Sequence, residues 1–111
     1  MSLPAPAIRR VDYTAAADRA ALITLLDAYA QDPMGGGTPL ADDVKARLCD
    51  ELAALPSADS FIAWIGDEAV GLVNTFEGYS TFKARPLLNV HDIAVLPAHR
   101  ARGVGQALLA A

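Results

Sequence analysis

The C-terminal end of the sequence contains residue types that can bind phosphate groups. Two arginines and two glycines are interleaved with small residues in "RARGVGQ", residues 100–106, which follows an apolar segment and opens a helical pattern. The first turn of a helix has unpaired backbone N–H groups and the positive end of the helix dipole, and both attract phosphate. Glycine lets the backbone approach an anion closely, and arginine adds a fixed positive charge. The stretch therefore predicts a pyrophosphate-binding turn.

Two common nucleotide-binding motifs do not fit this stretch. A dinucleotide-binding G-x-G-x-x-G motif needs a third glycine, and that position holds Leu108. A P-loop needs a lysine after its second glycine, and that position holds Gln106. The alternative that involves no ligand is a turn eased by glycine, with its arginines in solvent.

A third pattern does fit. Arg-x-x-Gly-x-Gly at residues 100–105, preceded by "HDIAVLPAH", closely resembles the acetyl-CoA motif of the GNAT family of N-acetyltransferases. The resemblance extends over about residues 7–111 and is sharpest over residues 89–109. More loosely, "GYSTFKARPLLNVHDIAV" resembles the branch of that family that acetylates polyamines, thialysine and related small amines.

The resemblance implies that acetyl-CoA is the cosubstrate and that no metal ion takes part. The pantetheine arm would lie along the strand before the motif, and a backbone N–H near Ile93 would donate to the thioester carbonyl. The pyrophosphate would lie on the backbone N–H groups of the turn. The implied cofactor-binding residues are Ile93, Ala94, Val95, Arg100, Ala101, Arg102, Gly103, Val104, Gly105 and Gln106.

The resemblance also implies direct attack of an amine on acetyl-CoA in a ternary complex. An alkylamine is mostly protonated at neutral pH, so a base must remove its proton. His91 is the first candidate, although polyamine-type relatives usually carry glutamate there; Asp92 and Glu77 are weaker candidates. Each of the three also has an interpretation without a catalytic role. His91 would then form a hydrogen bond in the core, Asp92 would have a structural role, and Glu77 would be a solvated charge in a loop. Alternation along a strand predicts that the side chains of His91 and Asp92 lie on opposite faces of the sheet.

The hydrophobic patterns predict the elements that position these residues. A short strand at residues 8–11 precedes a helix with an apolar face at spacings of three and four, which Asp12 or Thr14 caps. A second helix is expected to open at Thr38-Pro39, bury a stripe that ends with Leu55, and stop at Pro56. "FIAWI" and "AVGLVNTF" are predicted as a hairpin, residues 77–86 as a loop, residues 87–95 as a third strand, and a last helix from about Gly103.

The order β-α-α-β-β-β-α predicts a single α/β domain with a mixed sheet, over residues 1–111. The resemblance implies that this is the GNAT-type acyl-CoA N-acyltransferase fold. The last helix lacks a closing glycine, basic residue or proline, so we expect the domain to be truncated after the start of the cofactor-binding helix. The 111 residues alone are then expected to be inactive or to need a partner chain, and a homodimer stays open.

The composition of the sequence limits the kinds of partner and the cellular location that we expect. A net charge of −4 argues against nucleic acid, and no apolar run approaches the ~18 residues of a membrane span. Cys49 is the only cysteine, and the absence of a secretory signal favours the cytoplasm. The leading hypothesis is acetyl transfer from acetyl-CoA to a primary amine of a small molecule such as a polyamine or an amino acid. The alternatives are a CoA-binding regulatory module without turnover, and an α/β domain whose turn is fortuitous.

Overall fold

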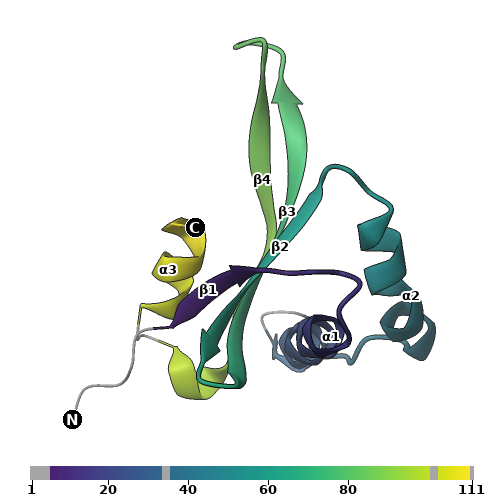
Figure 1. Ribbon diagram of the computed structural model, residues 1–111, viewed down its shortest axis with the longest axis vertical. Coiled ribbons are helices and arrows are strands. Elements are labelled where there is room, and N and C mark those ends of the chain that lie inside the picture. Colours follow the sequence, from purple (N-terminus) through teal and green to yellow (C-terminus); the bar gives the residue numbers. More distant parts are fainter. Residues whose placement is uncertain (1–5, 34–35, 101–102, 111) are drawn as a thin grey trace.

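The computed structural model describes residues 6–33, 36–100 and 103–110 of the chain. Its elements are β1 (Ala7–Arg10), α1 (Ala16–Gln31), α2 (Asp42–Ala53), β2 (Ala58–Ile65), β3 (Glu68–Ser80), β4 (Arg85–Val95), a 3-10 turn (Pro97–His99) and α3 (Val104–Ala110) (Figure 1). The predicted order of elements and the α/β class are confirmed. No helix within the described ranges has the length and apolar character of a membrane span.

The four strands form one sheet in the order β1-β2-β3-β4, and each pairs antiparallel with the next along the chain. Helices α1 and α2 lie on one face of this sheet and α3 lies on the other (Figure 1). Beyond the helices, β3 and β4 continue as a long projecting hairpin. Because every connection is between neighbours, β4 becomes an edge strand of the described sheet.

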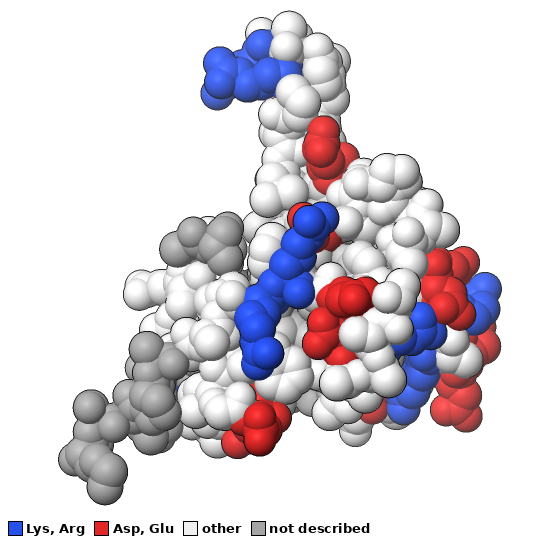
Figure 2. All heavy atoms as spheres, in the orientation of Figure 1, with Lys and Arg blue, Asp and Glu red and all other residues white. Residues whose placement is uncertain are grey.

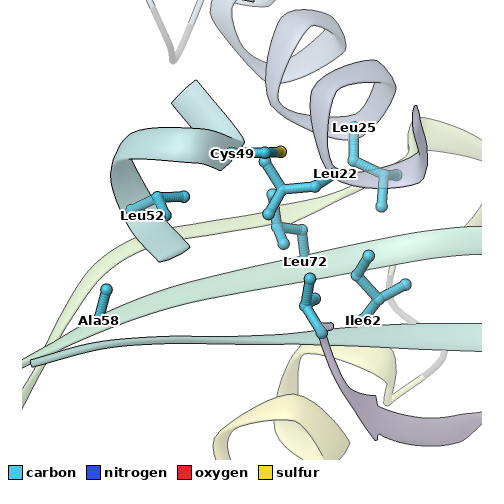
Figure 3. Close-up of a cluster of buried hydrophobic side chains, with 8 residues drawn as sticks. Leu22, Leu25, Cys49, Leu52, Ala58, Ile62 and Leu72 are labelled. Atoms are coloured by element: carbon cyan, nitrogen blue, oxygen red, sulfur yellow. The ribbon is translucent and has the colours of Figure 1, made fainter. Parts of the chain in front are cut away.

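The α1/α2 face holds the larger of two apolar clusters. Leu22 and Leu25 from α1 and Cys49 and Leu52 from α2 pack onto β2 and β3 (Figure 3). Cys49 is buried in this cluster, and burial raises the pKa of its thiol. This cluster fixes α1 against the sheet, and with it the end of α1 that lies beside the end of β4.

Helix α3 packs onto the opposite face through Val104 and Leu108. A Cβ added at Gly71 of β3 would lie 2.9 Å from Val104 Cγ1 and 3.0 Å from Leu108 Cδ1. The absence of a side chain at Gly71 therefore lets α3 approach the sheet closely. That approach sets the position of the turn that leads into α3.

The start of α2 differs from the prediction. The helix begins at Asp42, so the expectation that Thr38-Pro39 opens it is wrong. The residues before it are held against α1 instead, because the Thr38 N–H donates to the Ala30 carbonyl at 3.0 Å and the Leu40 N–H donates to Asp27 at 2.9 Å. The predicted cap of α1 is also absent, since the helix has no side-chain cap and Asp12 instead accepts two hydrogen bonds from Thr14.

Two further expectations about the elements are corrected. Leu55 is 47% exposed, because α2 ends at Ala53 and the apolar stripe does not reach it. Residues 77–86, predicted as a loop, are mostly strand, and Ser80 pairs with Arg85 across a turn at residues 81–84. Backbone pairing in a hairpin does not require an apolar pattern, and Pro86 is tolerated because β4 is an edge strand.

Candidate cofactor and acceptor site

The predicted phosphate-binding turn surrounds a pocket where β4 ends and α3 begins. This turn pocket has a volume of about 400 Å³. It is lined by Val95, His99, Arg100, Gly103, Val104, Gly105 and Gln106. All but His99 are predicted cofactor-binding residues, so the structure brings six of them together; Ala101 and Arg102 lie outside the described residues.

The two glycines leave the mouth of the turn pocket open. Gly103 has φ +78°, a left-handed conformation that favours glycine, and an added Cβ would meet nothing within 4 Å. At Gly105 the nearest atom to an added Cβ would be Ile93 Cδ1 at 3.9 Å. The Ala107 N–H donates to the Gly103 carbonyl at 2.9 Å, so the preceding N–H groups of this turn belong to the unpaired first turn of the helix. An anion can reach these groups without a steric barrier.

Arg100 joins the turn to the end of α1. Its Nη2 donates to Asp32 at 2.8 Å and its Nε donates to the Val95 carbonyl at 3.0 Å. The guanidinium is therefore held in place although the side chain is 48% exposed. Arg100 also borders a second pocket of about 200 Å³ between α1 and the end of β4, which Tyr29 and Ala94 help to line. One fixed charge thus lies beside both pockets.

The predicted pantetheine strand is the last part of β4. Ala94 is buried opposite Leu72 of β3, whereas Ile93 lies opposite Val73 and is exposed. Since β4 is the edge strand of the described sheet, alternate backbone groups point away from β3. Such an edge can pair with an extended chain carrying amide groups.

His91 occupies a β-bulge. Asn74 pairs with Asp92 but Thr75 pairs with Val90, so His91 has no partner residue on β3. The His91 ring meets the Phe76 ring edge-on at 5.5 Å between centroids, and Asn74 Nδ2 donates to Asp92 Oδ2 at 3.2 Å.

The side chains of His91 and Asp92 both lie toward the α1/α2 face of the sheet. Phe76 packs against the apolar cluster of that face, and Asn74 is two residues away on the same strand. The expectation that His91 and Asp92 point to opposite faces is therefore wrong, because the bulge interrupts the alternation. The two candidate bases share one surface.

Glu77 lies apart from this arrangement. Its side chain is exposed, and its backbone N–H donates to the Ser57 carbonyl at 2.9 Å. It helps to line a shallow pocket with Pro56, Ser57, Gly78 and Tyr79, which shares no residue with the turn pocket. The structure does not bring Glu77 together with the cofactor-binding residues.

Three residues of the site were not identified from the sequence. Asp32 binds Arg100 across 68 positions of the chain, and Ser60 and Asn74 connect to Asp92 through hydrogen bonds. No local pattern marks any of them. Only the knowledge that β2, β3 and β4 are neighbours would have placed Ser60 and Asn74 in line with Asp92.

Solved structures share this fold. A ribosomal-protein-alanine N-acetyltransferase from Brucella melitensis biovar Abortus 2308 has a TM-score of 0.74 and 21% identity, with 96% of this chain and 67% of that chain covered. An aminoglycoside acetyltransferase from an uncultured soil metagenomic sample, solved with sisomicin, has a TM-score of 0.75 and 19% identity, covering 95% and 65%. An integron cassette protein from the mobile metagenome of Cole Harbour Salt Marsh has a TM-score of 0.80 and 25% identity, covering 93% and 64%.

The chain thus spans about two thirds of the length of these three structures. A search of curated protein sequences finds no match. The model of the acetyltransferase (GNAT) family matches residues 22–111, which is most of the sequence and includes β4, the turn pocket and α3. This chain belongs to the acetyltransferase (GNAT) family.

Proposed function

We propose that the protein transfers an acetyl group from acetyl-CoA to a primary amine of a small molecule. The observation that carries the proposal is the turn pocket, with its two open glycines, at the end of an edge strand. Family membership supports acyl transfer in general. The loose resemblance of residues 78–95 to polyamine-type acetyltransferases favours a polyamine or a similar amine as the acceptor.

The described residues fit acetyl-CoA. The space in front of Gly103 and Gly105, which a side chain would fill, gives the pyrophosphate access to backbone N–H groups. Arg100 adds positive charge beside them, and the exposed edge of β4 at Ile93 to Val95 can pair with the amides of pantetheine. Ala101 and Arg102, which lie outside the described residues, stay predicted cofactor-binding residues.

Acetyl-CoA supplies an acetyl thioester. Once the ammonium group has given one proton to a base, the acetyl group passes to the neutral nitrogen as a C–N bond forms, the C–S bond breaks, the nitrogen loses its second proton and the sulfur gains one. The backbone N–H near Ile93 orients the thioester carbonyl and stabilises the charge on its oxygen. His91 or Asp92 receives the proton of the amine. Their shared face lets one hold the ammonium group while the other takes its proton.

Calorimetric titration with CoA tests the cofactor half of this proposal. Gly103→Ala should weaken binding about tenfold, since a Cβ there strains the left-handed backbone and stands in the path of the phosphate. Gly66→Ala is the matched control, because Gly66 also has positive φ, +61°, and open space but lies in the β2–β3 turn. Equal affinity for CoA in the parent and the Gly103 variant, or no binding by the parent, would contradict the proposal.

A further inference from the structure

A row of polar side chains crosses the sheet from the β1–α1 connection to β4. Tyr13 Oη lies 2.7 Å from Ser60 Oγ, which lies 2.6 Å from Asn74 Oδ1. Asn74 Nδ2 in turn lies 3.2 Å from Asp92 Oδ2. Ser60, Asn74 and Asp92 are directly paired in the strand register, so the row follows from the pairing of β2, β3 and β4.

The middle of this polar row is buried in an apolar face. Ser60 is 1% exposed and Asn74 is 4% exposed, and Ile62 and Leu72 are their neighbours on the same strands. Burying polar groups is costly unless each is hydrogen-bonded, and apolar side chains would fill these places without that requirement. Packing alone therefore does not account for a serine and an asparagine here.

All donors in the polar row point toward Asp92. Ser60 has a single hydroxyl proton, and Asn74 Oδ1 can only accept, so Ser60 donates to Asn74. Tyr13 must then donate to Ser60. Asn74 Nδ2 can only donate, which leaves the carboxylate of Asp92 as the final acceptor. Hydrogen bonds aligned in this way polarise and strengthen one another.

We infer that Tyr13, Ser60 and Asn74 are positioning residues that fix the carboxylate of Asp92 for a cationic acceptor amine, an inference that rests on the proposed acetyl transfer. An amide in the middle of the row orients its neighbours and does not pass a proton along. Among the described residues, Asp92 accepts a side-chain hydrogen bond only from Asn74, through Oδ2. The second oxygen, Oδ1, is the one that meets the ammonium group, next to His91 at the bulge.

Steady-state kinetics of the complete gene product with acetyl-CoA and spermidine test this inference. Asn74→Ala should raise the KM for spermidine about tenfold, because the hydrogen bond from the side-chain amide of Asn74 to the carboxylate of Asp92 is lost. Ser60 does not contact Asp92, yet Ser60→Ala should raise the KM for spermidine about threefold. Tyr13→Phe should raise this KM by less. The affinity for CoA should not change in any of these variants.

Thr75→Val is the matched control. Thr75 is also buried in β3 and its hydroxyl donates to the Asp59 carbonyl at 2.9 Å, but it is not part of the polar row. This variant loses a comparable hydrogen bond and should leave the KM for spermidine unchanged. An unchanged KM in both Ser60→Ala and Asn74→Ala, or an equal rise in Thr75→Val, would overturn the inference.

A second measurement separates this inference from the proposed function. The carboxyl carbon resonance of Asp92, observed by NMR in ¹³C-labelled protein, should move in Ser60→Ala and Asn74→Ala and stay in place in Thr75→Val. If the parent does not acetylate spermidine but this resonance responds, the acceptor assignment fails and the positioning of Asp92 stands. If the resonance does not respond, the polar row does not position Asp92 and the inference is wrong.

Discussion

Arg100 is the residue through which the phosphate-binding turn is connected to the rest of the domain. Its guanidinium donates to the Asp32 carboxylate at the end of α1 and to the Val95 carbonyl at the end of β4. These two hydrogen bonds need two separate N–H donors on one planar group. A lysine has a single ammonium group and cannot reproduce this geometry. The same charge lies at the turn pocket, where a pyrophosphate would bind.

Arg100→Ala and Arg100→Lys should therefore both weaken CoA binding, and the alanine variant should lose about tenfold. The loss in the alanine variant should grow at low salt, where charges are screened less. Calorimetric titrations at two salt concentrations measure both effects. Lys83→Ala is the control, because Lys83 is an exposed cation in the turn between β3 and β4. An affinity in Arg100→Lys equal to that of the parent would show that charge alone matters.

His91 lies at an exposed bulge position, and its ring and the Phe76 ring meet in a T-shaped contact. If it takes the proton of the amine, His91→Ala should lower the turnover rate at pH 7 about a hundredfold while the Kd for CoA stays nearly the same. The loss should shrink at high pH, where more of the amine is already neutral. A pH–rate profile that matches the parent's would remove His91 and leave Asp92 as the base.

At the scale of elements, the features of the fold that depend on local sequence patterns could be predicted from the sequence. The order of helices and strands was predicted correctly and the start of α3 to within one residue, because apolar spacing and the glycines before α3 are local signals. The bulge at His91 was not predicted, since it results from the register of two strands. The same holds for the polar row and for Asp32, whose partners are distant in the sequence.

The connection between α1 and α2 depends on Asp27. A hydrogen bond from the Leu40 N–H, aided by Lys45 and Gln31, holds the pKa of the Asp27 carboxyl below its ordinary value of 3.8. The stability that this carboxylate contributes is fully present above its ordinary pKa and is lost as the pH falls through the lower pKa of the folded state.

Asp27→Asn should therefore lower the Tm by about 3 °C at pH 7, and by less at an acid pH well below 3.8. Thermal unfolding followed by circular dichroism at both pH values measures the difference. Asp67→Asn, in the exposed β2–β3 turn, is the control and should leave the Tm unchanged at pH 7. A deficit of the same size at both pH values would show that the charge of Asp27 contributes nothing.

At the scale of the whole molecule, charge and apolar surface are unevenly distributed. The tip of the β3–β4 hairpin carries basic side chains, and the body of the domain carries both acidic and basic ones (Figure 2). Several apolar residues of β4 and α3 are exposed, among them Leu87, Leu88, Val90, Ile93 and Leu109. An open strand edge beside exposed apolar side chains favours pairing with another chain.

The 111-residue chain should therefore associate as its concentration rises, which sedimentation velocity measures. Val90→Lys should reduce this association by placing a charge on the edge strand. Leu55→Lys is the control, since Leu55 and Val90 are both 47% exposed but Leu55 lies past the end of α2. A monomer at every concentration, or an equal effect of both variants, would show that the β4 edge is not an association surface.

Acetyl transfer itself is tested most directly by incubating the complete gene product with acetyl-CoA and a panel of polyamines, amino acids and aminoglycosides. Mass spectrometry of the amines and a thiol assay for released CoA follow both products of the reaction. We expect at least one amine to be converted to its amide, with an equal amount of CoA thiol released, and Gly103→Ala to be slower than Gly66→Ala at limiting acetyl-CoA. Thiol release without any acetylated amine, or no reaction with any amine of the panel, would contradict the proposed function.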